Sequence, residues 1–142
     1  DRLGAMASGC KQETISSISK WAWHSGIIFQ ITDDILDLSS DEKTLGKPSG
    51  NDIIEGTYTL PVLIALEKYP EKINKILSDI SENKVGVNEV INEFNNDEII
   101  SESKLFLKTH LEKSESAAKE IDNKTVRNIL LDINTYLIER SN

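Results

Sequence analysis

The stretch that decides the fold is Phe29-Gln30-Ile31-Thr32-Asp33-Asp34-Ile35-Leu36-Asp37, which places three carboxylates inside an otherwise apolar run. An α-helix turns by about 100° per residue, so Gln30 and the three aspartates fall within an arc of roughly 100°. Ile31, Ile35 and Leu38 fall on the other side, where they can pack against a core. The stretch therefore predicts a helix with one acidic face and one buried face.

Three carboxylates on one helix face repel one another, and each like-charge pair one turn apart costs about 0.2–0.5 kcal/mol of helix stability. We therefore expect a cation opposite the acids, and a divalent ion is the natural candidate. Mg²⁺ prefers oxygen ligands and is usually held by one or two carboxylates together with substrate phosphates. Asp33 and Asp37 lie one helical turn apart, which suits bridging through a metal. The alternative is a solvated acidic face, which is the usual meaning of a bare Asp-Asp-x-x-Asp.

A loop rich in turn-forming residues follows the acidic helix, over residues 39–51. It contains Gly46-Lys47-Pro48, in which residues that let the backbone approach a ligand flank a lysine. Alone, Lys47 would be an ordinary surface lysine. Beside the acidic helix, its point charge is a good partner for a diphosphate.

The rest of the chain has apolar residues at helical spacing, and no segment alternates with the period of a strand. Long helices are predicted over 13–38, 71–81, 99–121 and 124–140. Another helix runs to about residue 68, with Thr59 as N-cap and Pro61 in its first turn. Pro70 marks the next break, and Asn88 is expected to cap a further short helix. The predicted fold class is all-α.

The chain has 142 residues, of which 38% are hydrophobic, enough for one compact domain or a piece of a larger one. No apolar run approaches the ~20 residues that span a bilayer. The net charge of −8, from 16 basic and 24 acidic residues, argues against non-specific nucleic-acid binding. Cys10 is the single cysteine, which excludes an internal disulfide and favours a reducing, cytoplasmic location.

The acidic helix and the segments after it resemble the second aspartate-rich region of trans-prenyl (polyprenyl) diphosphate synthases. The resemblance is carried by Gly26-x-x-Phe29-Gln30-x-x-Asp33-Asp34-x-x-Asp37, Gly46-Lys47-Pro48, Asp52, Glu55-Gly56 and Thr59-Leu60-Pro61. It implies a helical bundle of the isoprenoid synthase type, with an active-site cavity between two aspartate-rich helices. It also implies Mg²⁺-dependent, head-to-tail condensation of isopentenyl diphosphate with an allylic diphosphate.

The resemblance further implies roles for individual residues. Asp33, Asp34 and Asp37 would be catalytic, with Asp33 and Asp37 as ligands of Mg²⁺. The substrate-binding residues would be Gln30, Lys47 and Phe29, with Lys47 in contact with the diphosphate.

The chain departs from the family pattern in two ways. The family's other aspartate-rich motif has no counterpart, so residues 1–142 are expected to be a C-terminal fragment of a single polyprenyl synthase domain, inactive by itself. Thr57 stands where many members have a lysine. An uncharged residue there resembles the large catalytic subunit, component II, of heptaprenyl diphosphate synthase. Such enzymes make the menaquinone side chain with a small regulatory subunit, so a heterodimer is expected, with a homodimer as the alternative.

Two other functions remain open at this stage. The first is a non-catalytic helical subunit of a prenyl synthase complex, suggested by Thr57 and the missing motif. The second is a terpene cyclase, which is disfavoured because no Asn/Ser/Glu metal triad follows downstream. His24 and His110 are expected to be isolated from each other and from any cysteine, so neither is expected to bind metal.

Overall fold

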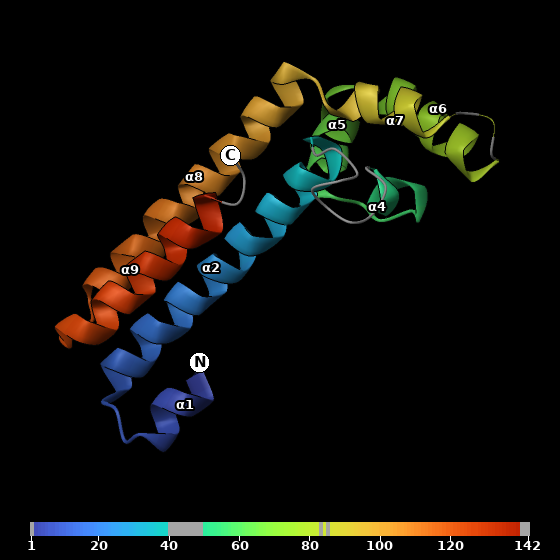
Figure 1. Cartoon of the computed structure of the whole chain (residues 1–142). Coiled ribbons are helices and arrows are strands. Elements are labelled where there is room, and N and C mark those ends of the chain that lie inside the picture. The colour runs from blue at the N-terminus through green and yellow to red at the C-terminus, as the bar shows by residue number, and fades with distance from the viewer. Residues whose placement is uncertain (1, 40–49, 83, 85, 140–142) are drawn as a thin grey trace. The chain divides into compact units, whose positions relative to one another are not determined.

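The computed structural model describes residues 2–39, 50–82, 84 and 86–139, and within these ranges it contains helices and no strand (Figure 1). The helices are α1 (Arg2–Ala7), α2 (Gln12–Ser39), α4 (Asn51–Ile54), α5 (Leu60–Lys68), α6 (Pro70–Ser81), α7 (Val87–Phe94), α8 (Asp97–Lys119) and α9 (Lys124–Glu139). The predicted all-α fold is confirmed. The predicted contact residue Lys47 lies outside the described residues.

The helix boundaries follow the sequence signals closely. The helix predicted over 13–38 extends one residue further at each end as α2. Thr59 is the N-cap of α5, as predicted, and Pro70 is the first residue of α6. The expectation that Asn88 caps the short helix is wrong, because α7 begins at Val87 with Gly86 as its N-cap.

The helix predicted to begin at residue 99 begins at Asp97 instead. Asn96 acts as its cap, because the Oδ1 atom of Asn96 accepts a hydrogen bond from the Ile99 N–H at 3.0 Å. Asp97 and Glu98 then occupy the first turn, where negative charge interacts favourably with the helix dipole.

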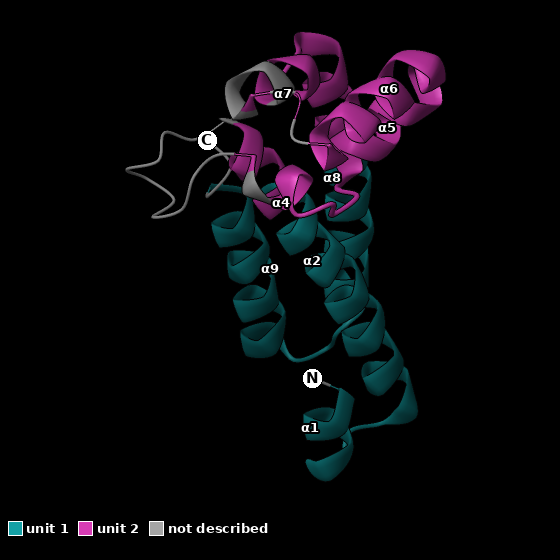
Figure 2. Ribbon diagram, turned by 90° about the vertical axis from the view of Figure 1, so that its right-hand side faces the viewer, with its two compact units in different colours: residues 1–32, 106–142 teal, residues 33–105 magenta. Residues whose placement is uncertain are grey.

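The chain divides into two compact units, residues 1–32 with 106–142, and residues 33–105 (Figure 2). In the first unit, α2 packs against α8 and α9 around a buried apolar cluster. The cluster consists of Trp21, Ala117, Ala118, Ile121 and Leu130.

A buried polar network joins the same three helices of the first unit. The Ser25 hydroxyl donates to the Asn134 side-chain oxygen at 2.8 Å, and the two serine hydroxyls of Ser25 and Ser114 lie 2.9 Å apart. The Asn134 amide nitrogen donates to the Ser114 hydroxyl at 2.9 Å. Because Asn134 is only 1% exposed, these bonds replace the water that its amide would otherwise bind.

The second unit has its own core, formed where the C-terminal end of α2 meets α4, α5, α6, α7 and the start of α8. The buried members are Leu38, Ile53, Val62, Ile64, Ala65, Ile73, Phe94 and Ile99. Leu38 follows Asp37 directly, so this core anchors the acidic end of α2.

Gly50 is the point where the chain enters α4, and it requires a glycine. Its φ is +71°, and a Cβ at this position would lie 2.6 Å from the Cγ1 atom of Ile91. Gly50→Ala should therefore lower the free energy of unfolding by at least about 1–2 kcal/mol. Gly26→Ala in α2 is the matched control, because nothing lies within 4 Å of its Cβ position. That control should stabilise the helix by about 0.5–1 kcal/mol in urea unfolding, and an equal loss in both variants would contradict the prediction.

Candidate functional site

The three aspartates lie on the last turns of α2, in the second unit, but they differ in their exposure. Asp33 is partly exposed, whereas Asp34 is 5% and Asp37 is 1% exposed. The expectation that Ile31, Ile35 and Leu38 are buried is confirmed. The three aspartates share one face of the continuous helix α2, as expected, but that face is covered at Asp34 and Asp37. A purely solvated acidic face is thereby excluded.

The carboxylate of Asp34 binds the start of α5. Its Oδ2 atom accepts a hydrogen bond from the Leu60 backbone N–H at 2.9 Å. Leu60 is the first residue of α5, so this N–H has no acceptor within its own helix. Asp34 therefore supplies a cap from a position 26 residues earlier in the sequence.

Asp37 faces the segment that leads into α4. Its Oδ2 atom lies 3.4 Å from the Asp52 N–H, and its backbone carbonyl accepts a hydrogen bond from the Gly50 N–H at 2.8 Å. The side-chain amide of Asn95 donates to the backbone carbonyl of Leu38 at 3.1 Å. These contacts fix the C-terminal end of α2 to α4 and α7 within the second unit.

The two predicted substrate-binding residues on α2 precede Asp33 by about one helical turn and belong to the first unit. Phe29 is 44% exposed, and Gln30 is also exposed. Both side chains are therefore accessible, as a role in substrate binding requires.

The donor chemistry of Asp33 fits a magnesium ion. A partly exposed carboxylate can offer a hard oxygen ligand, and Mg²⁺ in phosphate-processing sites often takes only one or two carboxylates from the protein. Among the described residues, no group of three or more histidine, cysteine, aspartate or glutamate side chains could hold a metal by itself. A partly exposed carboxylate such as that of Asp33 is suited to share a metal with phosphate oxygens.

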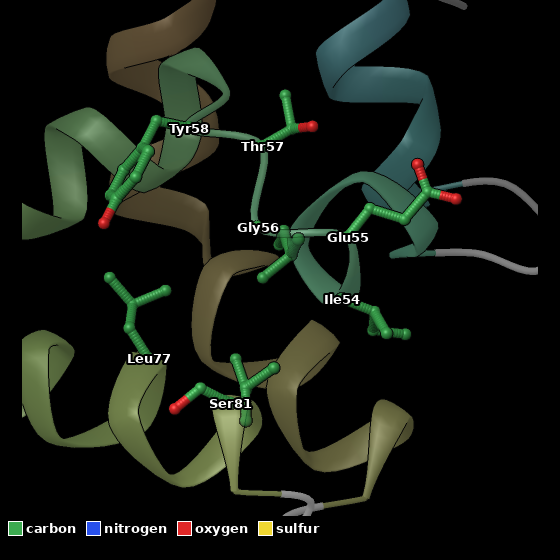
Figure 3. Close-up of a pocket in the computed structure, with 9 residues that line it drawn as sticks. Ile54, Glu55, Gly56, Thr57, Tyr58, Leu77 and Ser81 are labelled. Carbon is green, nitrogen blue, oxygen red and sulfur yellow. The ribbon is translucent and has the colours of Figure 1, made fainter.

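A separate pocket of about 320 Å³ lies in the second unit between the α4–α5 segment and α6 (Figure 3). In that view Leu77 points from α6 towards Tyr58. The lining residues are Ile53, Ile54, Glu55, Gly56, Thr57, Tyr58, Leu77, Ile80 and Ser81. None of the three aspartates is among them, so the pocket is distinct from the acidic cluster.

The expectation that His24 and His110 are isolated from each other is wrong. Their Nδ1 atoms lie 3.1 Å apart, and their ring planes meet at 61°. The packing of α2 against α8 brings together two residues that are 86 positions apart in the sequence. Sequence spacing carries no signal for such a contact.

This histidine pair should make the stability of the first unit depend on pH. Burial is the larger cause that lowers the pKa of both histidines, and His110 and Lys113 lower the pKa of His24 further. A group whose folded pKa lies below its unfolded value of 6.5 binds fewer protons in the folded state. Its stabilising contribution is complete above pH 6.5 and is lost as the pH falls through the folded pKa.

The measurement is urea unfolding at about pH 7.5 and about pH 5. His24→Gln should lose less unfolding free energy between the two pH values than the wild type does. The reciprocal variant His110→Gln should behave in the same way. An unchanged pH dependence in both variants would assign the acid sensitivity to other groups.

Comparison with known proteins gives consistent matches. The sequence profile of the polyprenyl synthetase family matches residues 2–97. Heptaprenyl diphosphate synthase component 2 of Bacillus subtilis is 31% identical over 139 residues, which cover 98% of this chain and 40% of that protein. No helix in the described part of the chain has the length and apolar character needed to cross a membrane.

Solved structures agree with the sequence matches. Heptaprenyl diphosphate synthase from Staphylococcus aureus matches with a TM-score of 0.87 and 30% identity, over 99% of this chain and 45% of that one. Geranylgeranyl pyrophosphate synthase from Corynebacterium glutamicum, complexed with calcium and isoprenyl diphosphate, matches with a TM-score of 0.81 and 26% identity, over 99% of this chain and 44% of that one. The chain therefore spans less than half the length of these relatives.

Proposed function

The chain belongs to the polyprenyl synthetase family, and on this basis we propose that the protein carrying it is a trans-polyprenyl diphosphate synthase. Its reaction is the head-to-tail condensation of isopentenyl diphosphate with an allylic diphosphate. The observation that carries the proposal is the partly exposed carboxylate of Asp33 next to the buried, hydrogen-bonded carboxylate of Asp34. The carboxylate of Asp33 is thus accessible to a metal, and the hydrogen bond of Asp34 fixes the backbone beside Asp33.

Asp33 is the proposed ligand of Mg²⁺. The Mg²⁺ that Asp33 would hold would provide Lewis-acid chemistry at the diphosphate. Lys47 adds a second positive charge to the same diphosphate. Gln30 and Phe29, both exposed on α2, contact the substrate next to Asp33.

Asp37 has a different proposed role from the one that its spacing suggests. The family resemblance implies Asp37 as a second metal ligand and its spacing suits that role, but Asp37 is 1% exposed and its carboxylate faces the Asp52 N–H. We therefore assign the metal contact to Asp33 and the support of α4 to Asp37.

The proposed product is a medium-chain polyprenyl diphosphate, heptaprenyl diphosphate for menaquinone, made in the cytoplasm. Two relatives called heptaprenyl diphosphate synthase support this, since each matches nearly the whole of this chain. The name component 2 of the Bacillus subtilis relative supports a second, small subunit as the partner. Thr57, in place of a lysine, supports the same assignment.

The test is chain elongation by the intact protein that contains this chain. It is supplied with farnesyl diphosphate, labelled isopentenyl diphosphate and Mg²⁺, with and without a candidate small subunit. The expected result is a labelled medium-chain product that requires Mg²⁺. Failure to incorporate label under either condition would refute the proposal.

A non-catalytic helical subunit is the second candidate, because Thr57 removes one cation from the segment that precedes α5. It predicts that Mg²⁺ with a bisphosphonate leaves the melting temperature of the intact protein unchanged. A ligand that binds only the folded state at 100 times its Kd adds about 2.7 kcal/mol of stability. A clear rise in melting temperature would therefore eliminate this candidate.

A further inference from the structure

We propose that Asp34 is a positioning residue, whose carboxylate caps α5 and so holds the segment before α5 next to Asp33. The inference rests on the proposed function for its effect on catalysis, but the cap itself can be tested without any activity. Asp33 and Asp34 are adjacent in one motif, but they have different roles because their carboxylates have different contacts.

The first observation is the hydrogen bond from the Leu60 N–H to the Oδ2 atom of Asp34, at 2.9 Å. Asp34 is 5% exposed, so water has little access to this carboxylate. A negative charge at a helix N-terminus also interacts favourably with the helix dipole. The carboxylate thus supplies both the acceptor and the charge that the first turn of α5 lacks.

The second observation is that the local N-cap residue does not perform this task. Thr59 occupies the N-cap position with φ −72° and ψ 164°, but its side chain makes no capping hydrogen bond. Its Oγ1 atom is buried and has no hydrogen-bond partner in the described part of the chain. A threonine at an N-cap normally binds an N–H of the first turn. Here Thr59 makes no such bond, and a carboxylate from another helix instead binds the N–H of Leu60, the first residue of α5.

The cap at Asp34 also affects Asp33, because the two residues are joined by a peptide bond. Asp33 and Asp34 are consecutive on α2, so a bond from Asp34 to Leu60 fixes the start of α5 relative to the backbone of Asp33. Buried residues of α5, among them Val62 and Ala65, anchor the helix to the core of the second unit. The segment Glu55–Thr59 is therefore held at both ends, by α4 and by the capped α5.

Hydrogen exchange of the Leu60 amide in the intact protein tests the cap directly. Asp34→Ala should speed exchange of this amide by about tenfold or more, because the N–H loses its buried acceptor. Asp34→Asn keeps an oxygen acceptor, and asparagine is as good an N-cap as aspartate, so its exchange should stay close to that of the wild type. Unchanged exchange in Asp34→Ala would overturn the proposal.

Thr59→Val is the matched control. It removes the residue at the conventional cap position at nearly constant shape. Because the hydroxyl of Thr59 makes no hydrogen bond to any residue that the structure describes, the Leu60 exchange rate should not rise and the melting temperature should not fall. A loss in Thr59→Val as large as that in Asp34→Ala would show that Thr59, and not Asp34, caps α5.

Activity then separates positioning from metal binding. Asp34→Ala should lower kcat by about tenfold and leave the half-maximal Mg²⁺ concentration within about twofold, whereas Asp34→Asn should recover most of kcat. If Asp34→Asn were as inactive as Asp34→Ala and also needed more Mg²⁺, Asp34 would act through its charge on the metal. If the wild type itself were inactive, the proposed function would fail, and the exchange data would still decide the cap.

Discussion

Replacing Asp33 by asparagine should lower kcat of the intact protein by about 10²–10³-fold, with a higher Mg²⁺ concentration needed for half-maximal rate. The amide keeps the size of the side chain but loses the negative charge that a hard divalent ion requires. Because Asp33 is partly exposed, the substitution should leave the melting temperature nearly unchanged. Steady-state elongation at a series of Mg²⁺ concentrations measures both effects.

Asp132→Asn provides the matched control for this experiment. Asp132 is an exposed aspartate on α9, so the same chemical change there should alter neither kcat nor the Mg²⁺ requirement. Full activity of Asp33→Asn at the wild-type Mg²⁺ concentration would remove Asp33 from the metal site.

Replacing Asn134 by alanine should lower the free energy of unfolding by about 3 kcal/mol. The variant leaves a cavity in the first unit. It also leaves the buried hydroxyls of Ser25 and Ser114 without the side chain of Asn134 as their hydrogen-bond partner. Urea unfolding followed by circular dichroism measures the loss. We expect the unfolding midpoint to fall without a change in slope, since the native state stays compact.

Two further variants give this prediction its controls. Asn128→Ala changes an exposed asparagine on the same helix and should stay within about 0.5 kcal/mol of the wild type. Combining Ser25→Ala, Ser114→Ala and Asn134→Leu removes every member of the network, so it should cost much less than Asn134→Ala alone. A triple variant that is less stable than Asn134→Ala would show that packing, and not unsatisfied polar groups, dominates.

The fold could be predicted from the sequence because its signals are local. The spacing of Ile31, Ile35 and Leu38 indicated α2, and the pattern from Thr59 to Pro61 gave the start of α5. Asn96 was missed as the cap of α8 because the helix was predicted to start at residue 99. The helix starts at Asp97, directly after Asn96. The misplaced cap at Asn88 reflects the same limit, because several residues near a helix start can serve as caps.

For the candidate site, the sequence predicts a set of residues but not the contacts that each of them makes. Nothing near Asp34 in the sequence indicates that its partner is the N–H of Leu60, and a helical wheel cannot show that a carboxylate is buried by another segment. The contacts of Ser25 with Asn134 and of His24 with His110 likewise join residues far apart in the chain. Such pairs depend on how helices pack, and a single sequence does not encode that packing in any local pattern.

The close approach at Gly50 has a consequence for how this protein can vary. A methyl group at position 50 would collide with the side chain of Ile91, so the two positions should be energetically coupled. Shortening Ile91 to alanine removes the colliding atoms, and the double variant should then lose less stability than the two single losses added together. A small residue 91 should therefore relieve the steric part of the loss at residue 50, whereas the strain of a non-glycine residue at a φ of +71° remains.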